Sequence, residues 1–324
     1  MPTKRALLCA ALCAGLATSL TLAQPASYPN KTIRVIVPFA AGGPADVVAR
    51  EMAQALGQEL GQGVVVENMG GGAGVPATNT VARSPADGHT LLFAASGNVV
   101  IQPLLSSKRV DILTQLSPVA MVTTSPHVLV VSSKLPVKTV KEFTDYAKAN
   151  PGSVNFASAG VGGLAHLASE LFMRAAGIEA RHIAYKGSSQ AMTDLASGQV
   201  QAMFSSLPSM KGMVDKGLLR VIGVSAASPS PAYKDIPLIK QAGVPGFEYQ
   251  TWYGIYGPAG LPTAVTTRLG SALAKLAANK DFENRLREQG VDLHLSSPQE
   301  LADRTRKESA EWDKVIRAAN IQLN

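Results

Sequence analysis

Cysteine is almost absent from this chain. Only Cys9 and Cys13 occur among 324 residues, and both lie in the first 23. That segment, "MPTKRALLCAALCAGLATSLTLA", has a basic start, an apolar run and small residues before Gln24, which is the pattern of a cleaved secretory signal peptide. Each cysteine follows a leucine, not the small residue of a lipoprotein signal. We therefore predict an exported protein with no lipid anchor, disulfide or thiol chemistry.

Long apolar runs, aromatics and dense charge are also scarce. No later segment reaches the roughly 20 apolar residues of a membrane span, which predicts a soluble mature protein. Only Trp252 and Trp312 offer large stacking surfaces, which disfavours sugar binding. The net charge is +7, and the densest basic run, "RTRK" at 304–307, shares its helix with Asp303, Glu308 and Glu311. That pattern favours a solvated helix face over a nucleic-acid surface, while the mild positive excess suits an anionic small ligand.

Motifs for metals, nucleotides and covalent catalysis are weak. The five histidines lack zinc spacing and no G-x-x-x-x-G-K-[ST] occurs, so we predict no metal and no cofactor. "GVGGLA" at 160–165 matches G-x-G-x-x-A, but Glu179, the acid expected to bind a ribose, begins the next strand instead of ending it. A hydrolase remains an alternative, because Ser158, His166 and Asp46 could meet in a cleft, although G-x-S-x-G is absent.

Strand-like and helix-like segments alternate along the mature chain. The strand-like runs are "TIRVIVPF", "GVVVEN", "HTLLFAA", "HVLVVSS", "VNFASA", "ARHIAYKG", "VQAMFSS" and "LRVIGVSA". The segments between them carry apolar residues at three- and four-residue spacing, which predicts an α/β fold with mostly parallel sheets. The series restarts near "HVLVVSSKLP", which indicates two lobes. The last helix, 298–320, carries an apolar stripe predicted to face the core: Leu301, Trp312, Val315, Ile316 and Ala319.

Four strand-to-helix turns are rich in glycine: 41–44, 70–74, 160–163 and 187–189. Backbone N–H groups at a helix start have no intrahelical partner, and the helix dipole favours negative charge there. Pro44 fits the first turn of a helix, where its missing N–H costs nothing. Any single turn of this kind is explained by the backbone conformation of a tight turn, which favours glycine without any ligand. Four of them at the carboxyl ends of strands, where open α/β sheets bind ligands, favour an anion site.

Several of these segments, taken in order, carry a family resemblance. They are "YPNKTIRVIVPFAAGGPADVVAR", "VVENMGGGAGVPATNTVARSPADGHTLLFA", "FASAGVGGLAHLASELF", "YKGSSQAMTDLASGQV" and "IPLIKQAGVPGFEYQTWYGIYGPAGLP". From about Tyr28 to its end, the chain resembles the Bug, or TctC-like, periplasmic substrate-binding proteins of tripartite tricarboxylate transporters. The resemblance implies a type II-like, two-lobed flytrap with two crossover segments that closes on a small mono- or dicarboxylate. It also implies a periplasmic monomer that serves integral membrane transporter subunits, with no catalysis.

The resemblance also implies which residues bind the ligand. The first-lobe cradle of backbone amides is formed by Ala41, Gly42 and Gly43, with Asp46 following it. The second-lobe loop contains Ser158, Gly160, Gly162 and His166, and a neighbouring wall contains Tyr185, Gly187 and Ser188. Asp46 either braces its own turn or pairs with a ligand amino group. His166 is either a packing residue or a donor that faces the crevice. Ala45 and Gly163 stand where the family often has a hydroxyl residue, so ligand identity is not carried over.

The predicted organisation places the signal peptide at 1–23, lobe 1 at 27–124 plus 227–324, and lobe 2 at 125–226. The crossover strands are expected near 122–131 and 221–256. A sensing protein that feeds a signalling partner would share this fold and site, so it stays open beside transport.

Overall fold

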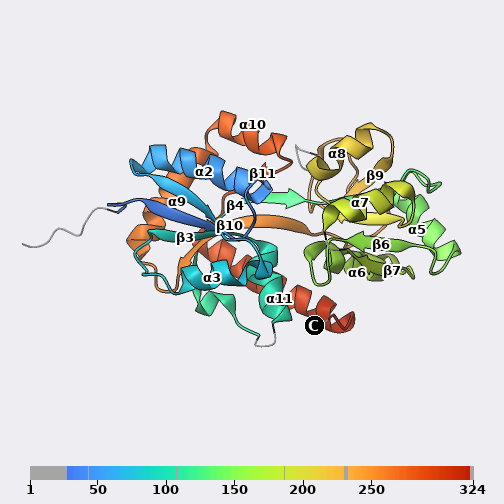
Figure 1. Ribbon diagram of the computed structural model, residues 1–324, viewed down its shortest axis with the longest axis horizontal. Coiled ribbons are helices and arrows are strands. Elements are labelled where there is room, and N and C mark those ends of the chain that lie inside the picture. Colours follow the sequence, from blue (N-terminus) through green and yellow to red (C-terminus); the bar gives the residue numbers. More distant parts are fainter. Residues whose placement is uncertain (1–27, 43, 107–108, 186, 230–232, 322–324) are drawn as a thin grey trace, which may run out of the picture.

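The computed structural model describes residues 28–42, 44–106, 109–185, 187–229 and 233–321. They form two β-sheets, each flanked by helices and lying on opposite sides of a narrow crossover (Figure 1). This arrangement confirms the predicted two-lobed α/β fold. The predicted signal peptide lies outside the described residues. Within the described ranges, no helix is long and apolar enough to cross a membrane.

The first sheet has the strand order β11-β4-β10-β3-β1-β2. Its strands are β1 (Ile33–Val37), β2 (Val64–Asn68), β3 (Thr90–Ala95), β4 (Leu116–Pro126), β10 (Gln250–Pro258) and β11 (Asp292–Leu293). Successive side chains of a strand point to opposite faces, so both faces of β1 bury apolar groups. Val35 packs with α2 (Pro44–Leu60), α9 (Thr263–Ala277) and α10 (Lys280–Glu288), whereas Ile36 packs with α3 (Val75–Ala82) and α11 (Pro298–Ala318).

The second sheet has the strand order β7-β6-β8-β5-β9. Its strands are β5 (Val128–Ser132), β6 (Asn155–Ser158), β7 (Arg181–Ala184), β8 (Ala202–Ser205) and β9 (Leu219–Val224). One face packs on α5 (Val140–Ala149) and α6 (Leu164–Ala176) around the stacked rings of Phe156 and Phe204. The other face packs on α7 (Ser188–Ser197) and α8 (Leu207–Asp215).

The predicted strand-like runs each contain a strand, but the expected sheet type is wrong. Four of the nine pairings between described strands are parallel and five are antiparallel. In the first sheet β10 returns from the second lobe antiparallel to β3 and β4, and β11 is antiparallel to β4; in the second sheet β5 is antiparallel to β8 and β9. β4 and β10 are not among the eight runs but overlap the crossover strands predicted near 122–131 and 221–256, whereas α9, α10 and β11 were not predicted. Short helical turns complete the fold: η1 (Gly72–Gly74), η2 (Gly97–Ile101), α4 (Gln102–Leu105) and η3 (Ile112–Thr114).

The two crossovers are hydrogen-bonded to one another. In the first, only His127 separates β4 from β5; in the second, residues 225–249 connect β9 to β10. The Ser225 amide donates to the His127 carbonyl at 2.9 Å, and the Ser225 hydroxyl accepts from the His127 amide at 3.0 Å. The Tyr249 amide donates to the Ser225 carbonyl at 2.9 Å. These bonds fix the two connections side by side, while the residue boundaries expected for the lobes stay a prediction.

Helix α11 begins with a capping box, in which Ser297 and Glu300 satisfy each other's backbone amides. Of its predicted apolar stripe, Leu301, Trp312, Val315 and Ile316 are buried and Ala319 is partly buried. The helix packs on β4 and also on α6 of the second sheet. It therefore contacts both lobes, as its course in Figure 1 also shows.

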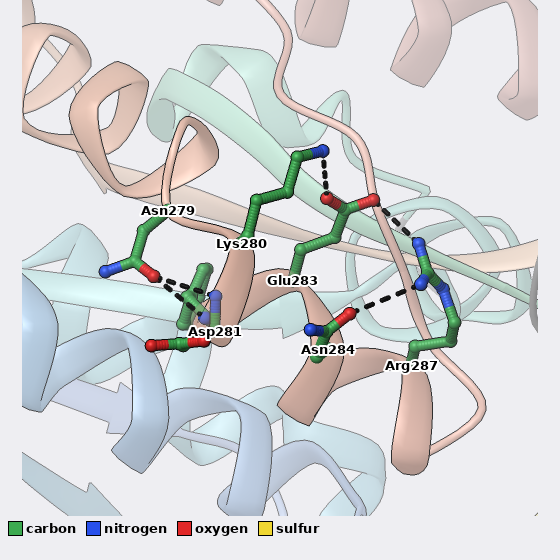
Figure 2. A network of polar contacts seen from close by, with 7 residues as sticks. Asn279, Lys280, Asp281, Glu283, Asn284 and Arg287 are labelled. Atoms are coloured by element: carbon green, nitrogen blue, oxygen red, sulfur yellow. Dashed lines mark hydrogen bonds and ion pairs between the residues drawn. The ribbon is translucent and has the colours of Figure 1, made fainter.

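Helix α10 is held at the surface of the first lobe by its apolar face. Figure 2 shows its start, where the Asn279 side chain accepts hydrogen bonds from two first-turn amides, and the ion pairs that Glu283 makes with Lys280 and Arg287. Exposed pairs of this kind contribute little stability. The buried side chains of Phe282 and Leu286 provide the main anchor.

The end of α10 contacts the second lobe. Gly290 has φ +67°, and a Cβ added there would lie 2.7 Å from Pro208 Cγ of α8. Its carbonyl accepts hydrogen bonds from the hydroxyls of Tyr233 at 2.9 Å and Ser125 at 3.2 Å. The close approach of α8 therefore requires a residue without a side chain.

We expect Gly290→Ala to lower the free energy of unfolding by about 1–2 kcal/mol through backbone strain, and further through the clash with Pro208. Urea unfolding measures the loss. Gly260→Ala is the matched control, because Gly260 has φ +82° and open space around its Cβ position. Equal losses for the two variants would contradict a role for the contact.

Candidate functional site

The carboxyl ends of the parallel strands in both sheets face the crossover. In the second sheet, β5 leaves the crossover at Val128, which pairs with Ser205 at the end of β8, and β6 runs parallel to β8. In the first sheet, β10 leaves the crossover at Gln250 and reaches Ala95, the end of β3, at Tyr253; β1 runs parallel to β3. The turns after β1 and β6 therefore lie on edges that face one another.

The first-lobe turn follows β1 and leads into α2, which begins at Pro44 as predicted. Ala41 and Gly42 are exposed, and Gly42 has φ +82°, a conformation that favours glycine. The Gly42 amide, expected to bind the ligand, donates to the Asp46 carboxylate at 2.9 Å in this structure. Gly43 lies outside the described residues.

Asp46 makes the contacts of a brace. Its side chain is buried and accepts from the Gly42 amide, from Arg50 Nε at 3.0 Å and from Asn68 Nδ2 at 2.9 Å. The hydrogen bond from Arg50, followed by those from the Gly42 amide and Asn68, lowers the pKa of Asp46 to about 2. Of the two roles considered from the sequence, these contacts match the bracing one. They tie the β1 turn to the end of β2.

Two asparagines that sequence reasoning missed hold this edge together. Asn68, the last residue of β2, also donates to the Phe39 carbonyl at 3.2 Å. Asn98 donates to the Ala73 carbonyl at 3.1 Å and accepts from the Ala95 amide at 3.2 Å, so it supports the glycine-rich turn of 70–74. One sequence gives no signal for Asn98, whereas Asn68 at the end of a strand-like run was visible.

The second-lobe turn is closed by its own side chains. The hydroxyl of Ser158, a buried residue, donates to the Gly160 carbonyl at 2.9 Å and accepts from the Gly160 amide at 3.2 Å. The Gly162 amide donates to His166 Nδ1 at 3.0 Å. His166 is buried, so its contacts are those of a residue that packs and accepts a hydrogen bond, not of a donor facing the crevice. The amides of Gly160 and Gly162, expected to bind a ligand, have internal partners here.

Sequence reasoning missed His182, which lies on β7 beside this turn. Its Nε2 is 2.7 Å from the Ser158 hydroxyl oxygen, and its ring stacks on that of His166 with centroids 3.6 Å apart. Burial, and then the neighbouring His166, lower the pKa of His182 to about 4. Only the fold brings these rings together, because they come from a helix and a strand.

The wall beside the turn begins helix α7. The Tyr185 hydroxyl donates to Asp194 at 2.8 Å, and burial followed by this bond raises the pKa of Tyr185 to about 12. Helix α7 begins at Ser188, directly after Gly187, and α6 begins directly after Gly163. Neither helix has a side-chain cap at its N-terminus. Both helix starts therefore offer uncapped backbone amides at the edge facing the first lobe.

The hydrolase alternative finds little support in this geometry. Ser158 is hydrogen-bonded to His182, not to His166, and Asp46 belongs to the other lobe's turn. A hydroxyl has one proton, and a carbonyl oxygen can only accept, so the proton of Ser158 is committed to Gly160. His182 then donates to Ser158 instead of taking its proton. The described residues also contain no group of three or more His, Cys, Asp or Glu residues arranged to hold a metal ion.

A cavity of about 690 Å³ lies away from these turns, between α11, Leu171 of α6 and the second crossover. Inside it Glu308 accepts from Trp252 Nε1 and from Arg304 Nε, both at 2.8 Å. Burial raises the pKa of Glu308. The charged side chains that line this cavity already form ion pairs, whereas the facing turns offer backbone amides.

The fold is that of a two-lobed periplasmic binding protein. It has two α/β lobes and two crossovers, and the carboxyl ends of the parallel strands of the two lobes face one another. Residues 48–321 match the model of the TctC family, the tripartite tricarboxylate transporter family receptor, and the chain belongs to this family. The predicted Bug, or TctC-like, membership is thus confirmed.

Solved structures support the assignment. The periplasmic binding protein BugD is 29% identical with a TM-score of 0.75, over 92% of this chain and 100% of that chain. An R. palustris protein solved with adipate is 32% identical with a TM-score of 0.79, over 91% and 99%. MatC from Rhodopseudomonas palustris, solved with bound malate, is 29% identical with a TM-score of 0.74, over 89% and 100%.

Proposed function

We propose that this protein captures a small mono- or dicarboxylate between its lobes and delivers it to the membrane subunits of a tripartite tricarboxylate-type transporter. Receptors of the TctC family are periplasmic. Export through residues 1–23 and delivery to those subunits are parts of the proposal. The observation that carries it is the pair of glycine-rich helix starts on facing edges of two lobes.

The uncapped starts of α6 and α7 provide the second-lobe half of the site, and the Ala41–Gly43 turn with the first turn of α2 provides the other half. Amides at a helix start carry fixed partial positive charge, so no arginine has to be ordered around the anion. Closure of the lobes by a hinge at the crossovers buries the ligand. The adipate and malate held by two relatives are ligands of this chemical class.

The expected affinity is compatible with capture and release. Four charge-assisted hydrogen bonds at roughly 3 kcal/mol apiece contribute about 12 kcal/mol. Association costs at least about 4 kcal/mol, which leaves about 8 kcal/mol and a Kd near 1 μM. A transported ligand has to leave the protein again, so an affinity near this value suits the role.

A thermal-shift screen of straight-chain C3 to C8 mono- and dicarboxylates tests the proposal. We expect at least one acid, at about 100 times its Kd, to stabilise the protein by about 2.7 kcal/mol and raise Tm by about 4 °C. The diamide of the same carbon skeleton is the matched control, because it keeps the shape and removes the charge. No shift with any acid, or an equal shift with the diamide, would contradict recognition of a carboxylate.

Binding without turnover is part of the same proposal. The bound acid should be recovered unchanged after prolonged incubation, as followed by NMR of the ligand. A model ester should likewise show no hydrolysis beyond buffer. A product that forms with wild-type protein and disappears in Ser158→Ala would favour the hydrolase alternative instead.

A further inference from the structure

His182 supports the second-lobe turn from outside it. The residue lies on β7, opposite Phe156 of β6 in the strand register, and its part-buried ring lies between Ser158 and His166. Its contacts with those two residues are a hydrogen bond of 2.7 Å and a ring stack at 3.6 Å with an interplanar angle of 15°. Ser158 and His166 in turn hold the amides of Gly160 and Gly162.

We infer that His182 is a positioning residue for the carboxylate site, acting through Ser158 and His166 to hold the turn that leads into α6. This inference rests on the proposed function. The ring makes both contacts at once, so its removal would release the two ends of the turn together. The turn ends at the uncapped start of α6, where a misplaced backbone would misdirect the amides that face the ligand.

The hydrogen bonds determine the tautomers of both rings. His166 Nδ1 accepts from the Gly162 amide, so the proton of neutral His166 lies on Nε2, which is 3.7 Å from Glu170 Oε1. The Ser158 proton goes to the Gly160 carbonyl, so His182 Nε2 must carry a proton and donate to the hydroxyl oxygen. Two neutral Nε2–H rings are therefore the state that fits this turn.

Protonation would act on the two rings in different ways. A proton added to His166 would occupy Nδ1 and oppose the Gly162 N–H, since both groups would then be donors. A proton added to His182 would place a positive charge against the His166 ring, whose charged neighbour is Glu170. The burial that lowers the pKa of His182 to about 4 keeps its ring neutral at neutral pH.

Affinity measurements at pH 7.5 test the inference, with the tightest acid of the C3 to C8 panel as the probe. We expect His182→Ala to raise Kd about tenfold, whereas His182→Gln, which keeps an N–H donor near the Nε2 position, stays within about threefold of wild type. His294→Gln is the matched control, because His294 is exposed and remote from the turn. An unchanged Kd for His182→Ala, or a loss for His182→Gln as large as for His182→Ala, would overturn the inference.

NMR of the ligand-free protein keeps the two proposals distinguishable. Long-range ¹H–¹⁵N spectra should show Nε2–H tautomers for both rings, and the Gly162 amide resonance should move in His182→Ala. That resonance should also titrate with the His182 ring in wild type but lose this step in His182→Gln. An Nδ1–H tautomer at His182, or a Gly162 amide unmoved by His182→Ala, would overturn the inference even if wild type binds acids. Failure of wild type to bind any acid would instead contradict the proposed function, and the tautomers and the Gly162 resonance would then still show whether His182 holds the turn.

Discussion

Replacing Asp46 by alanine should lower the free energy of unfolding by about 2–3 kcal/mol and weaken carboxylate binding at least tenfold. The buried carboxylate accepts hydrogen bonds from Gly42, Arg50 and Asn68, and truncation removes the shared acceptor of all three, although Asn68 keeps its bond to the Phe39 carbonyl. Arg50 is half exposed and regains water, which keeps the loss below that of a fully buried ion pair. The loosened turn would then present its amides to the ligand in many orientations.

Urea unfolding and calorimetric binding measure the two effects of Asp46→Ala. Asp303→Ala is the matched control, because Asp303 forms an exposed pair with Arg306 and should cost less than about 1 kcal/mol. An Asp46→Ala protein as stable as wild type would contradict the bracing role. The part of the stability that Asp46 contributes is present in full above about pH 4 and is lost as pH falls from there through its folded pKa of about 2.

A second large effect is expected from His127 at the crossover. Burial lowers the pKa of His127 to about 4, and its two ring nitrogens face the hydroxyls of Tyr249 at 2.8 Å and Thr251 at 3.2 Å. The unfolded chain takes up a proton near pH 6.5, whereas the folded chain does not until about pH 4. Stability therefore declines as pH falls from about 6.5 to about 4, by on the order of 3 kcal/mol for His127. His182, whose pKa is lowered for the same main reason, adds a smaller loss in the same direction because it is less buried.

Urea unfolding at several pH values between 7.5 and 4 measures this decline. His127→Gln, which cannot titrate, should be less stable than wild type at pH 7.5 but should lose less stability on acidification. His294→Gln, at an exposed position, should follow the wild-type curve. Parallel curves for wild type and His127→Gln would contradict the assignment of the acid effect to the crossover.

The order of eight strands and the start of α2 could be predicted from the sequence. Apolar runs that are buried on both faces of a sheet are continuous, which is why eight strands were recognisable, and Pro44 marked the start of α2. β10 was not among the strand-like runs and was placed only as part of a crossover near 221–256, because its sequence, "QTWYGIYGP", mixes glycines with aromatics and pairs through two register shifts. Such a strand follows no simple two-residue alternation.

The candidate site was predictable as turns but not as contacts. Glycines at strand ends predicted where backbone amides gather, and the register of β1, β3 and β6 places those turns on facing edges. Some partners that hold the turns were within reach of the sequence, because Arg50 lies four residues after Asp46 and Asn68 ends a strand-like run. Asn98 and His182 were not, because they come from elements distant in sequence from the turns that they support. Three of the amides expected to bind a ligand have internal partners.

The sequence by itself determined the class of fold, the family and the location of the glycine-rich turns, because apolar periodicity and backbone freedom are local properties. Only the tertiary structure decided that Asp46 accepts hydrogen bonds from Gly42 and Asn68, that Ser158 pairs with His182, and that the rings of His166 and His182 stack. Contacts of this kind depend on which strands become neighbours. That choice is made by the burial of the whole sheet and is not written at any single position.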